Sequence, residues 1–203
     1  MLFPFINKNF VVQNKPHTDI EISYKGYYDG YWQRLDIVEE VEDILLEKIK
    51  LIDSQKIKFE ELLFELNKHE SISIHIRRDD YINIPANAKI FEVCDRDYYE
   101  NAIRYFKKKF PNAKFYIFTQ DKQWALENFT GEEFQFISGN SAIEDMLLMA
   151  HCKHNIVANS TFSWWSAFLN RNKEKTVIAP KSWYKNTSNL STENFIKQNW
   201  IRI

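Results

Sequence analysis

The pattern of hydrophobic and polar residues changes near residue 69 of this 203-residue chain. Before that point, apolar residues recur at helical spacing over 37–49, and a second helix is predicted over 56–66 with Ser54 as its N-cap. After it, short apolar runs typical of strands alternate with helical stretches. The predicted strands cover 71–76, 115–119, 134–137, 155–158 and 176–179. Strands that alternate with helices form parallel sheets with right-handed crossovers, so the sequence predicts an α/β, Rossmann-like parallel sheet with flanking helices.

Polar residues mark where the helices of this second part are expected to begin. One helix is predicted to follow Asp95 and another to follow Asp121, because aspartate is a favoured N-cap. Ser141 and Glu144 have the spacing of a capping box at the start of a third helix. A fourth helix is predicted over 163–170. All but the first of these starts lie just beyond the end of a predicted strand, and Asp95 follows a longer segment.

Two stretches show no regular periodicity. Residues 1–35 are aromatic and irregular, and 79–94 is predicted to be a long loop of the kind that often binds ligands. The sequence therefore predicts an aromatic and helical N-terminal segment, 1–68, followed by a Rossmann-like domain, 69–203.

The composition limits which binding partners, cellular locations and nucleotide sites the sequence supports. The net charge is −1, so nothing in the overall charge favours binding to nucleic acid. Two cysteines, Cys94 and Cys152, are too few for a disulfide framework or a metal cluster and suggest reduced thiols in the cytoplasm. No apolar run approaches the roughly 18 residues of a membrane span. The chain holds four glycines and no glycine-rich phosphate loop. A nucleotide would have to be held by arginines and a helix N-terminus instead.

The first candidate site follows the strand over 71–76. Arg77 and Arg78 stand side by side there, and ligands of parallel α/β sheets bind beyond the carboxyl ends of the strands. Adjacent guanidinium groups repel each other, and a phosphate between them would remove that cost through forked hydrogen bonds. The alternative is a structural network in which the two arginines pair with Asp79 and Asp80.

The second candidate site follows the strand over 155–158. Asn159 is followed by three hydroxyl side chains, Ser160, Thr161 and Ser163, and no acidic residue occupies the first turn of the predicted helix. A helix start without acids suits an external anion such as a pyrophosphate. The alternative is that Ser160 is simply an N-cap.

The third candidate site is Asp121, which follows the strand over 115–119. Its carboxylate could accept hydrogen bonds from guanine, or it could serve only as a helix cap. Asp145 lies within a predicted helix and is expected to brace the adjoining loop.

These residues carry a resemblance to a known family. His75-Ile-Arg-Arg-Asp-Asp-Tyr81 resembles the H-x-R-R-x-D-Y motif of the α-1,2-fucosyltransferases of glycosyltransferase family 11. The stretch 145–170 resembles the family's second long motif, and 26–33 and 180–183 also fit. The likeness covers nearly all of the chain. One departure is Gln120, where the family usually shows a second acid beside Asp121.

The resemblance implies the donor-binding half of a GT-B-like, inverting, metal-independent transferase. Its donor would be GDP-fucose, its acceptor the 2-hydroxyl of a galactose in a glycan, and no other cofactor is expected. Arg77 would hold the β-phosphate as fucose departs, with Arg78 and Asp79 in support. His75 and Asp121 would face the nucleoside. The phosphates would lie against Asn159, Ser160, Thr161, Phe162 and Ser163, with Asp145 as structural support.

The family normally begins with a domain that carries a G-x-G-N-Q loop, which this sequence lacks. The resemblance therefore implies that acceptor recognition, together with part of the catalytic machinery, lies outside these residues. A lipid-linked acceptor would place the cytoplasmic protein at the periphery of a membrane.

Two other functions remain open from the residues. One is a GDP- or GDP-sugar-binding domain without transferase activity of its own. The other is a metal phosphoesterase with His75, Asp79 and Asp80 as ligands, although these residues suit Mg²⁺ or Mn²⁺ poorly in so short a segment.

Overall fold

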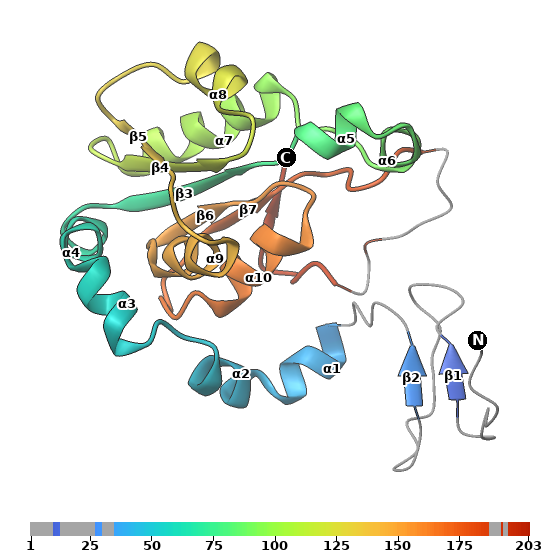
Figure 1. Ribbon diagram of the computed structural model, residues 1–203. Helices are drawn as coiled ribbons and strands as arrows, with labels where there is room; N and C mark the ends of the chain where they lie inside the picture. Colours follow the sequence, from blue (N-terminus) through green and yellow to red (C-terminus); the bar gives the residue numbers. More distant parts are fainter. Residues whose placement is uncertain (1–9, 13–26, 30–34, 187–191, 193–194) are drawn as a thin grey trace. The chain divides into compact units, whose positions relative to one another are not determined.

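The structure, a computed structural model, describes residues 10–12, 27–29, 35–186, 192 and 195–203 (Figure 1). These residues belong to two compact units, one within 1–42 and 189–197 and the other within 43–188 and 198–203. The first unit contains β1 (Phe10–Val12) and β2 (Tyr27–Asp29), which pair in parallel, and α1 (Leu35–Glu40). The sequence predicted no strand in this part, and that prediction is wrong. Tyr and Val in the pair have high β-propensity. Most of the predicted 26–33 motif lies outside the described residues.

The second unit begins with short helices. These are α2 (Glu42–Lys48), α3 (Asp53–Lys58) and α4 (Glu60–Lys68). The two helices predicted from periodicity are therefore each divided, and α3 starts at Asp53 rather than after a Ser54 cap. Phe59 separates α3 from α4 and is 7% exposed, because its ring packs in the core with Leu51 and Leu66. Tertiary packing here overrides the continuous helical pattern.

The main sheet has six strands, all parallel, in the order β5-β4-β3-β6-β7-β8. The strands are β3 (Ser71–Ile76), β4 (Lys114–Thr119), β5 (Phe134–Ile137), β6 (His154–Ile156), β7 (Val177–Ala179) and β8 (Ile201–Arg202). This arrangement confirms the Rossmann-like fold. β8, only two residues long, was not predicted. The chain moves from β3 toward β5 and then returns to the other side of β3, so the order reverses between β3 and β6.

Helices connect the strands. They are α5 (Asp79–Asn83), α6 (Pro85–Ile90), α7 (Arg96–Lys109), α8 (Lys122–Asn128), α9 (Ala142–His151) and α10 (Thr161–Leu169). The loop predicted over 79–94 is wrong in its first part, which forms α5 and α6. Pro85 begins α6, where its missing N–H costs no helical hydrogen bond. The predicted caps at Asp95, Asp121 and Ser141 are confirmed, since each side chain accepts a backbone N–H of the first turn.

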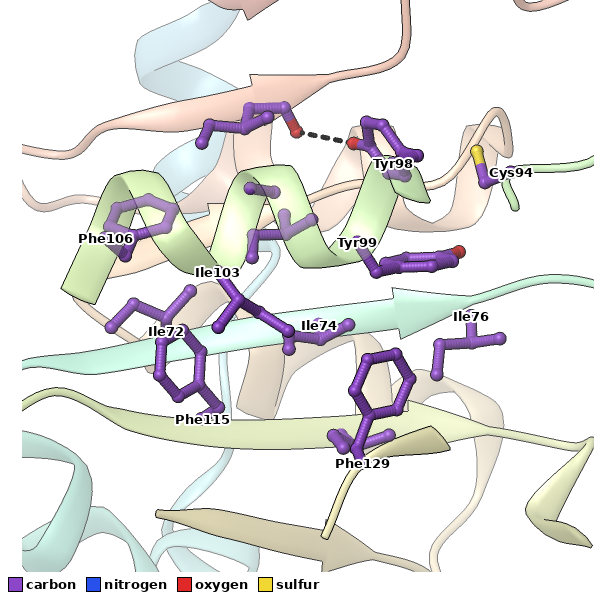
Figure 2. Packing of buried hydrophobic residues seen from close by; sticks show 14 of the residues in the cluster. Ile72, Ile74, Ile76, Cys94, Tyr98, Tyr99, Ile103, Phe106, Phe115 and Phe129 are labelled. Carbon is purple, nitrogen blue, oxygen red and sulfur yellow. Dashed lines mark hydrogen bonds between the residues drawn. The ribbon is translucent and has the colours of Figure 1, made fainter. Parts of the chain in front are cut away.

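The two faces of the sheet are covered by different helices (Figure 1). Ile72, Ile74 and Ile76 alternate toward the face packed by α7, where Figure 2 shows them facing Tyr99, Ile103 and Phe106. The other face packs against α4 and α9 through a second core cluster: Leu51, Phe59, Leu66, Tyr116, Phe118, Leu147, Leu148, Met149 and Cys152. A strand buried on both faces is a rigid support, and β3 delivers the arginine pair at its carboxyl end.

Candidate functional site

The two predicted sites come together where the strand order reverses. Ile74 of β3 pairs with Ile156 of β6, and continuing both chains in parallel brings Arg77 and the residues after β6 to the same edge of the sheet. The hydroxyl of Tyr81 donates to the carbonyl of Asn159 across this edge, at 2.9 Å. A crevice at a reversal of strand order is the usual ligand position in open α/β sheets.

Each arginine of the pair has a partner on its own side. An Arg77 terminal nitrogen lies 2.8 Å from Asp80 Oδ2, and its guanidinium carbon lies 5.7 Å from the centre of the Tyr81 ring. Arg78 Nε lies 3.4 Å from Asp121 Oδ2, and its guanidinium carbon lies 4.2 Å above the Trp124 ring. The structural network considered from the sequence is thus present in part. It holds the two guanidinium groups apart and fixes their positions.

Several buried polar atoms at this edge nevertheless lack a hydrogen-bond partner. Among the described residues, five buried side-chain polar atoms have no hydrogen-bond partner, and one of them is Trp200 Nε1. The other four lie within six consecutive residues: His75 Nδ1, Arg77 Nε, Arg78 Nε and Asp80 Oδ1. Buried polar groups are normally paired, and an unpaired one costs about 1–3 kcal/mol. Arg78 Nε still has an ion-pair partner in Asp121, 3.4 Å away. The concentration of these atoms at the carboxyl end of β3 marks a place where a polar ligand would stabilise the protein.

His75 lies at the base of the site. It is 5% exposed, its ring is 5.2 Å from that of Phe162, and the hydroxyl of Tyr99 donates to its carbonyl at 3.1 Å. Burial, together with the positive charge of Arg77, lowers the pKa of His75 to about 3. The imidazole is therefore neutral at pH 7, so one ring nitrogen donates a hydrogen bond and the other accepts one.

The start of α10 forms the opposite side. Ser160 is its N-cap, as the alternative from the sequence held, because its Oγ accepts the N–H of Phe162 at 3.3 Å. Ser163 Oγ donates to the carbonyls of Ala158 and Ser160, both at 3.2 Å. Thr161 is exposed, and the first turn has no acidic residue. Any anion here would meet backbone N–H groups and the Thr161 hydroxyl rather than the buried serines.

Asn159 is completely buried, and its amide is used within the protein. Its Nδ2 donates to the carbonyls of Glu92 and, at 2.8 Å, Trp183. Its Oδ1 lies 3.6 Å from the Cys94 thiol. The side chain anchors the turn before α10 to the segment after α6.

The remaining predicted carboxylates differ in exposure and partners. Asp79 is exposed and accepts from Asn83 Nδ2 at 2.7 Å. Asp121 caps α8 through the N–H of Trp124 at 3.2 Å. Asp145 accepts from Asn140 Nδ2 at 3.0 Å, so it braces the loop before α9, and burial raises its pKa. Contact with a nucleotide stays a prediction for Asp121.

Three aromatic residues that support the site were given no role from the sequence. They are Tyr81, Tyr99 and Trp124. Tyr81 closes the H-x-R-R-x-D-Y string. Trp124 stands three residues after Asp121, and its backbone N–H donates to that carboxylate. The pattern alone held no signal that these side chains would hold the carbonyls and guanidiniums around the crevice.

Within 10–12, 27–29, 35–186, 192 and 195–203, no three His, Cys, Asp or Glu side chains gather as a possible metal site. Metal independence stays a prediction. No helix in the described part of the chain is both long and apolar enough to cross a bilayer.

Comparison with known proteins points to one group of enzymes. Residues 11–203 match the sequence model of Glycosyl transferase family 11. The chain is 34% identical over 188 residues to an α-1,2-colitosyltransferase of Escherichia coli, covering 89% of this chain and 64% of that protein. It is 41% identical over 130 residues to the O-antigen biosynthesis glycosyltransferase WbnK of Escherichia coli, covering 61% of this chain and 43% of that protein.

More distant similarities involve fucosyltransferases. A galactoside α-(1,2)-fucosyltransferase 2 of Sus scrofa is 27% identical over 103 residues, covering 48% of this chain and 30% of that protein. The solved structure of the NodZ α-1,6-fucosyltransferase soaked with GDP-fucose aligns with a TM-score of 0.43 at 20% identity, covering 64% of this chain and 47% of that chain. The present chain thus spans less than two thirds of the length of these proteins.

Proposed function

Because the chain belongs to glycosyl transferase family 11, we propose that it transfers L-fucose from GDP-fucose to the 2-hydroxyl of a galactose unit in a glycan, with inversion at the sugar carbon. Membership of the family supports glycosyl transfer as the reaction. The donor and the acceptor are the proposal, and they are supported by similarity to galactoside α-(1,2)-fucosyltransferases over about half of the chain. The donor would lie at the edge between the carboxyl ends of β3 and β6.

The observation that carries the proposal is the set of unpaired buried atoms after β3. Arg77 Nε has no acceptor, and Arg78 Nε makes no hydrogen bond and lies 3.4 Å from Asp121 Oδ2. Both stand at the edge where α10 also presents a helix start free of acids. A diphosphate would supply an acceptor for Arg77 Nε and a second one for Arg78. The neutral ring of His75 next to Arg77 adds no competing charge. Asn159, Ser160 and Ser163 shape the turn, and Thr161 and Phe162 face the donor.

The chemistry follows from the charges at this edge. The bond between the sugar carbon and the β-phosphate oxygen breaks, its electrons go to that oxygen, and GDP leaves. Positive charge grows on the sugar and negative charge on the phosphate, where Arg77 stabilises the transition state more than the bound donor. The acceptor hydroxyl attacks from the opposite face of the sugar and passes its proton to Asp79. A new carbon–oxygen bond forms as the donor bond is lost.

A second donor is favoured by one comparison. The α-1,2-colitosyltransferase matches 89% of this chain, a larger share than the mammalian fucosyltransferases do. GDP-colitose is therefore the alternative donor for the same site.

The test is a turnover assay of the chain with GDP-fucose and GDP-colitose, each with methyl β-D-galactoside as acceptor. We expect GDP release that depends on the acceptor, and a product whose NMR spectrum shows an α-1,2 linkage. GDP binding measured by calorimetry without turnover of either donor would favour the nucleotide-binding alternative. Absence of GDP binding would refute the proposed site itself.

A further inference from the structure

An open pocket lies beside the arginine pair, on the β4 side of β3. It has a volume of about 490 Å³, within the range of roughly 300–1,000 Å³ found for small-molecule sites. Its described lining comes from the start of α5 and from the turn between β4 and α8: Asp79, Ile82, Asn83, Gln120, Asp121, Lys122 and Gln123. The edge between the carboxyl ends of β3 and β6, where we propose that the diphosphate lies, is on the other side of β3.

The chemistry of this lining disfavours a phosphate group and a stacked base. Two carboxylates and one ammonium group give it a negative balance, so a second phosphate would be repelled. None of the described lining residues is aromatic, so no side chain offers a stacking surface for a base. A neutral ligand without a large planar face suits the pocket better.

The same lining fits a saccharide. Sugar hydroxyl groups both donate and accept hydrogen bonds, and the pocket offers acceptors in Asp79, donors in Lys122 and both in its three amides. Ile82 is 48% exposed and provides an apolar wall for the C–H side of a sugar ring. The pocket therefore matches both surfaces of a pyranose.

Internal hydrogen bonds fix the orientation of two of these amides. Asn83 Nδ2 donates to Asp79 Oδ1 at 2.7 Å, and Gln123 Nε2 donates to Glu127 Oε1 at 2.9 Å. Each side chain retains its carbonyl oxygen and a second N–H for a ligand. Asp121 joins the pocket to the site, because its Oδ2 lies 3.4 Å from Arg78 Nε.

We propose that this pocket binds the acceptor saccharide, as a neutral galactoside ring held by Asn83, Gln123 and Lys122 with its reacting hydroxyl toward Asp79. The proposal rests on the proposed function, since it names where the second substrate of that site is held. Acceptor recognition then lies at least partly within these residues, contrary to the expectation that it lies beyond them.

The test uses side-chain NMR signals, so it does not depend on turnover. Methyl β-D-galactoside is titrated into the ¹⁵N-labelled chain with GDP present, and GDP is titrated separately. We expect the galactoside to shift the side-chain NH₂ signals of Asn83, Gln120 and Gln123, and GDP to shift the Nε–H signals of Arg77 and Arg78. The proposal is overturned if the galactoside, added up to its solubility limit, shifts none of the three side-chain NH₂ signals. It is also overturned if GDP shifts these NH₂ signals as far as the galactoside does.

Two variants and a control make the assignment specific. Asn83→Ala and Gln123→Ala should each weaken galactoside binding roughly fivefold, as expected for one lost hydrogen bond, with a smaller effect on GDP. Asn101→Ala, an exposed amide on α7 outside the pocket, should leave both affinities unchanged. Equal galactoside affinity in all four proteins would contradict the pocket. Failure of GDP to shift Arg77 and Arg78 would instead contradict the proposed function.

Discussion

The hydroxyl of Tyr81 donates a hydrogen bond of 2.9 Å to the carbonyl of Asn159. This contact links the helix after β3 to the turn after β6, so it connects the arginine side of the crevice with the start of α10. The Tyr81 ring also stacks on Phe91, with centroids 4.4 Å apart, and lies beneath the Arg77 guanidinium. One side chain thus sets the positions of both sides of the proposed donor site.

Tyr81→Phe is expected to lower the rate of fucosyl transfer about tenfold, because it removes the hydroxyl while keeping the stacked ring. The loss of a buried hydrogen bond, about 1 ± 0.5 kcal/mol, should change the thermal midpoint only modestly. Steady-state kinetics with saturating GDP-fucose, together with a melting curve, measure both effects. Tyr105→Phe is the control, since Tyr105 is partly exposed on α7 and far along the helix from the site. Equal rates for the two variants would show that the Tyr81 contact does not position the site.

Arg77→Ala is expected to reduce transfer by about 3–4 kcal/mol of transition-state stabilisation, or a few hundredfold. Arg77→Lys should lose most of that amount as well, because a lysine cannot replace the Nε donor or the planar fork. The measurement is kcat with GDP-fucose, and GDP affinity by calorimetry separates binding from chemistry. Arg104→Lys on the exposed surface of α7 is the matched control. A lysine variant that keeps most of the activity would remove Arg77 from its assigned role.

The sequence predicted the parts of this site that depend on strand ends. Ile72, Ile74 and Ile76 alternate with polar residues at the two-residue period of a strand. This pattern predicted where β3 ends and therefore where Arg77 lies. The short strand β8 and the helices over 79–90 could not, because they are too short for a periodic signal. Their formation depends on contacts with distant residues, such as the hydrogen bond from Tyr81 to Asn159.

The roles of individual polar groups were less predictable than their positions. Ser160 was expected either to cap a helix or to bind an anion, and the structure confirms the cap. Asn159 precedes it in sequence, yet its amide bonds to Glu92 and Trp183, which no local pattern indicates. A motif brings polar residues to the same place, whereas the fold decides which of their atoms are already paired.

Asp121→Asn separates the possible roles of that carboxylate. Asparagine is as good an N-cap as aspartate, so the stability of α8 should change little. One oxygen of Asp121 accepts the Trp124 N–H and the other lies 3.4 Å from Arg78 Nε, so we expect the substitution to weaken GDP and ADP binding by the same factor, through Arg78. Calorimetry with both nucleotides measures this. A loss of preference for GDP over ADP would support direct recognition of guanine by Asp121 instead.

The buried His75 predicts a pH dependence of stability. Its pKa falls from the ordinary 6.5 to about 3 on folding, because burial and the Arg77 charge disfavour the protonated ring. Between these values the unfolded chain binds the proton and the folded protein does not, so stability decreases as the pH falls below 6.5. The loss attributable to His75 should reach about 2 kcal/mol by pH 5. Urea unfolding at pH 7 and pH 5 measures it.

His75→Phe isolates this contribution from that of other groups. The pKa of His154 is also lowered by burial, so it adds a loss of the same sign in the wild-type protein. Glu144, with a pKa lowered to about 2 chiefly by Lys58, is stabilising above its ordinary 4.5 and loses that effect only at more acidic pH. The free energy of unfolding should therefore fall less between pH 7 and pH 5 in the variant than in the wild-type protein. The difference should equal the loss attributed to His75. A variant with the full wild-type dependence would mean that folding does not lower the pKa of His75. A cation would then stand beside Arg77 below pH 6.5, contrary to the neutral ring described for the site.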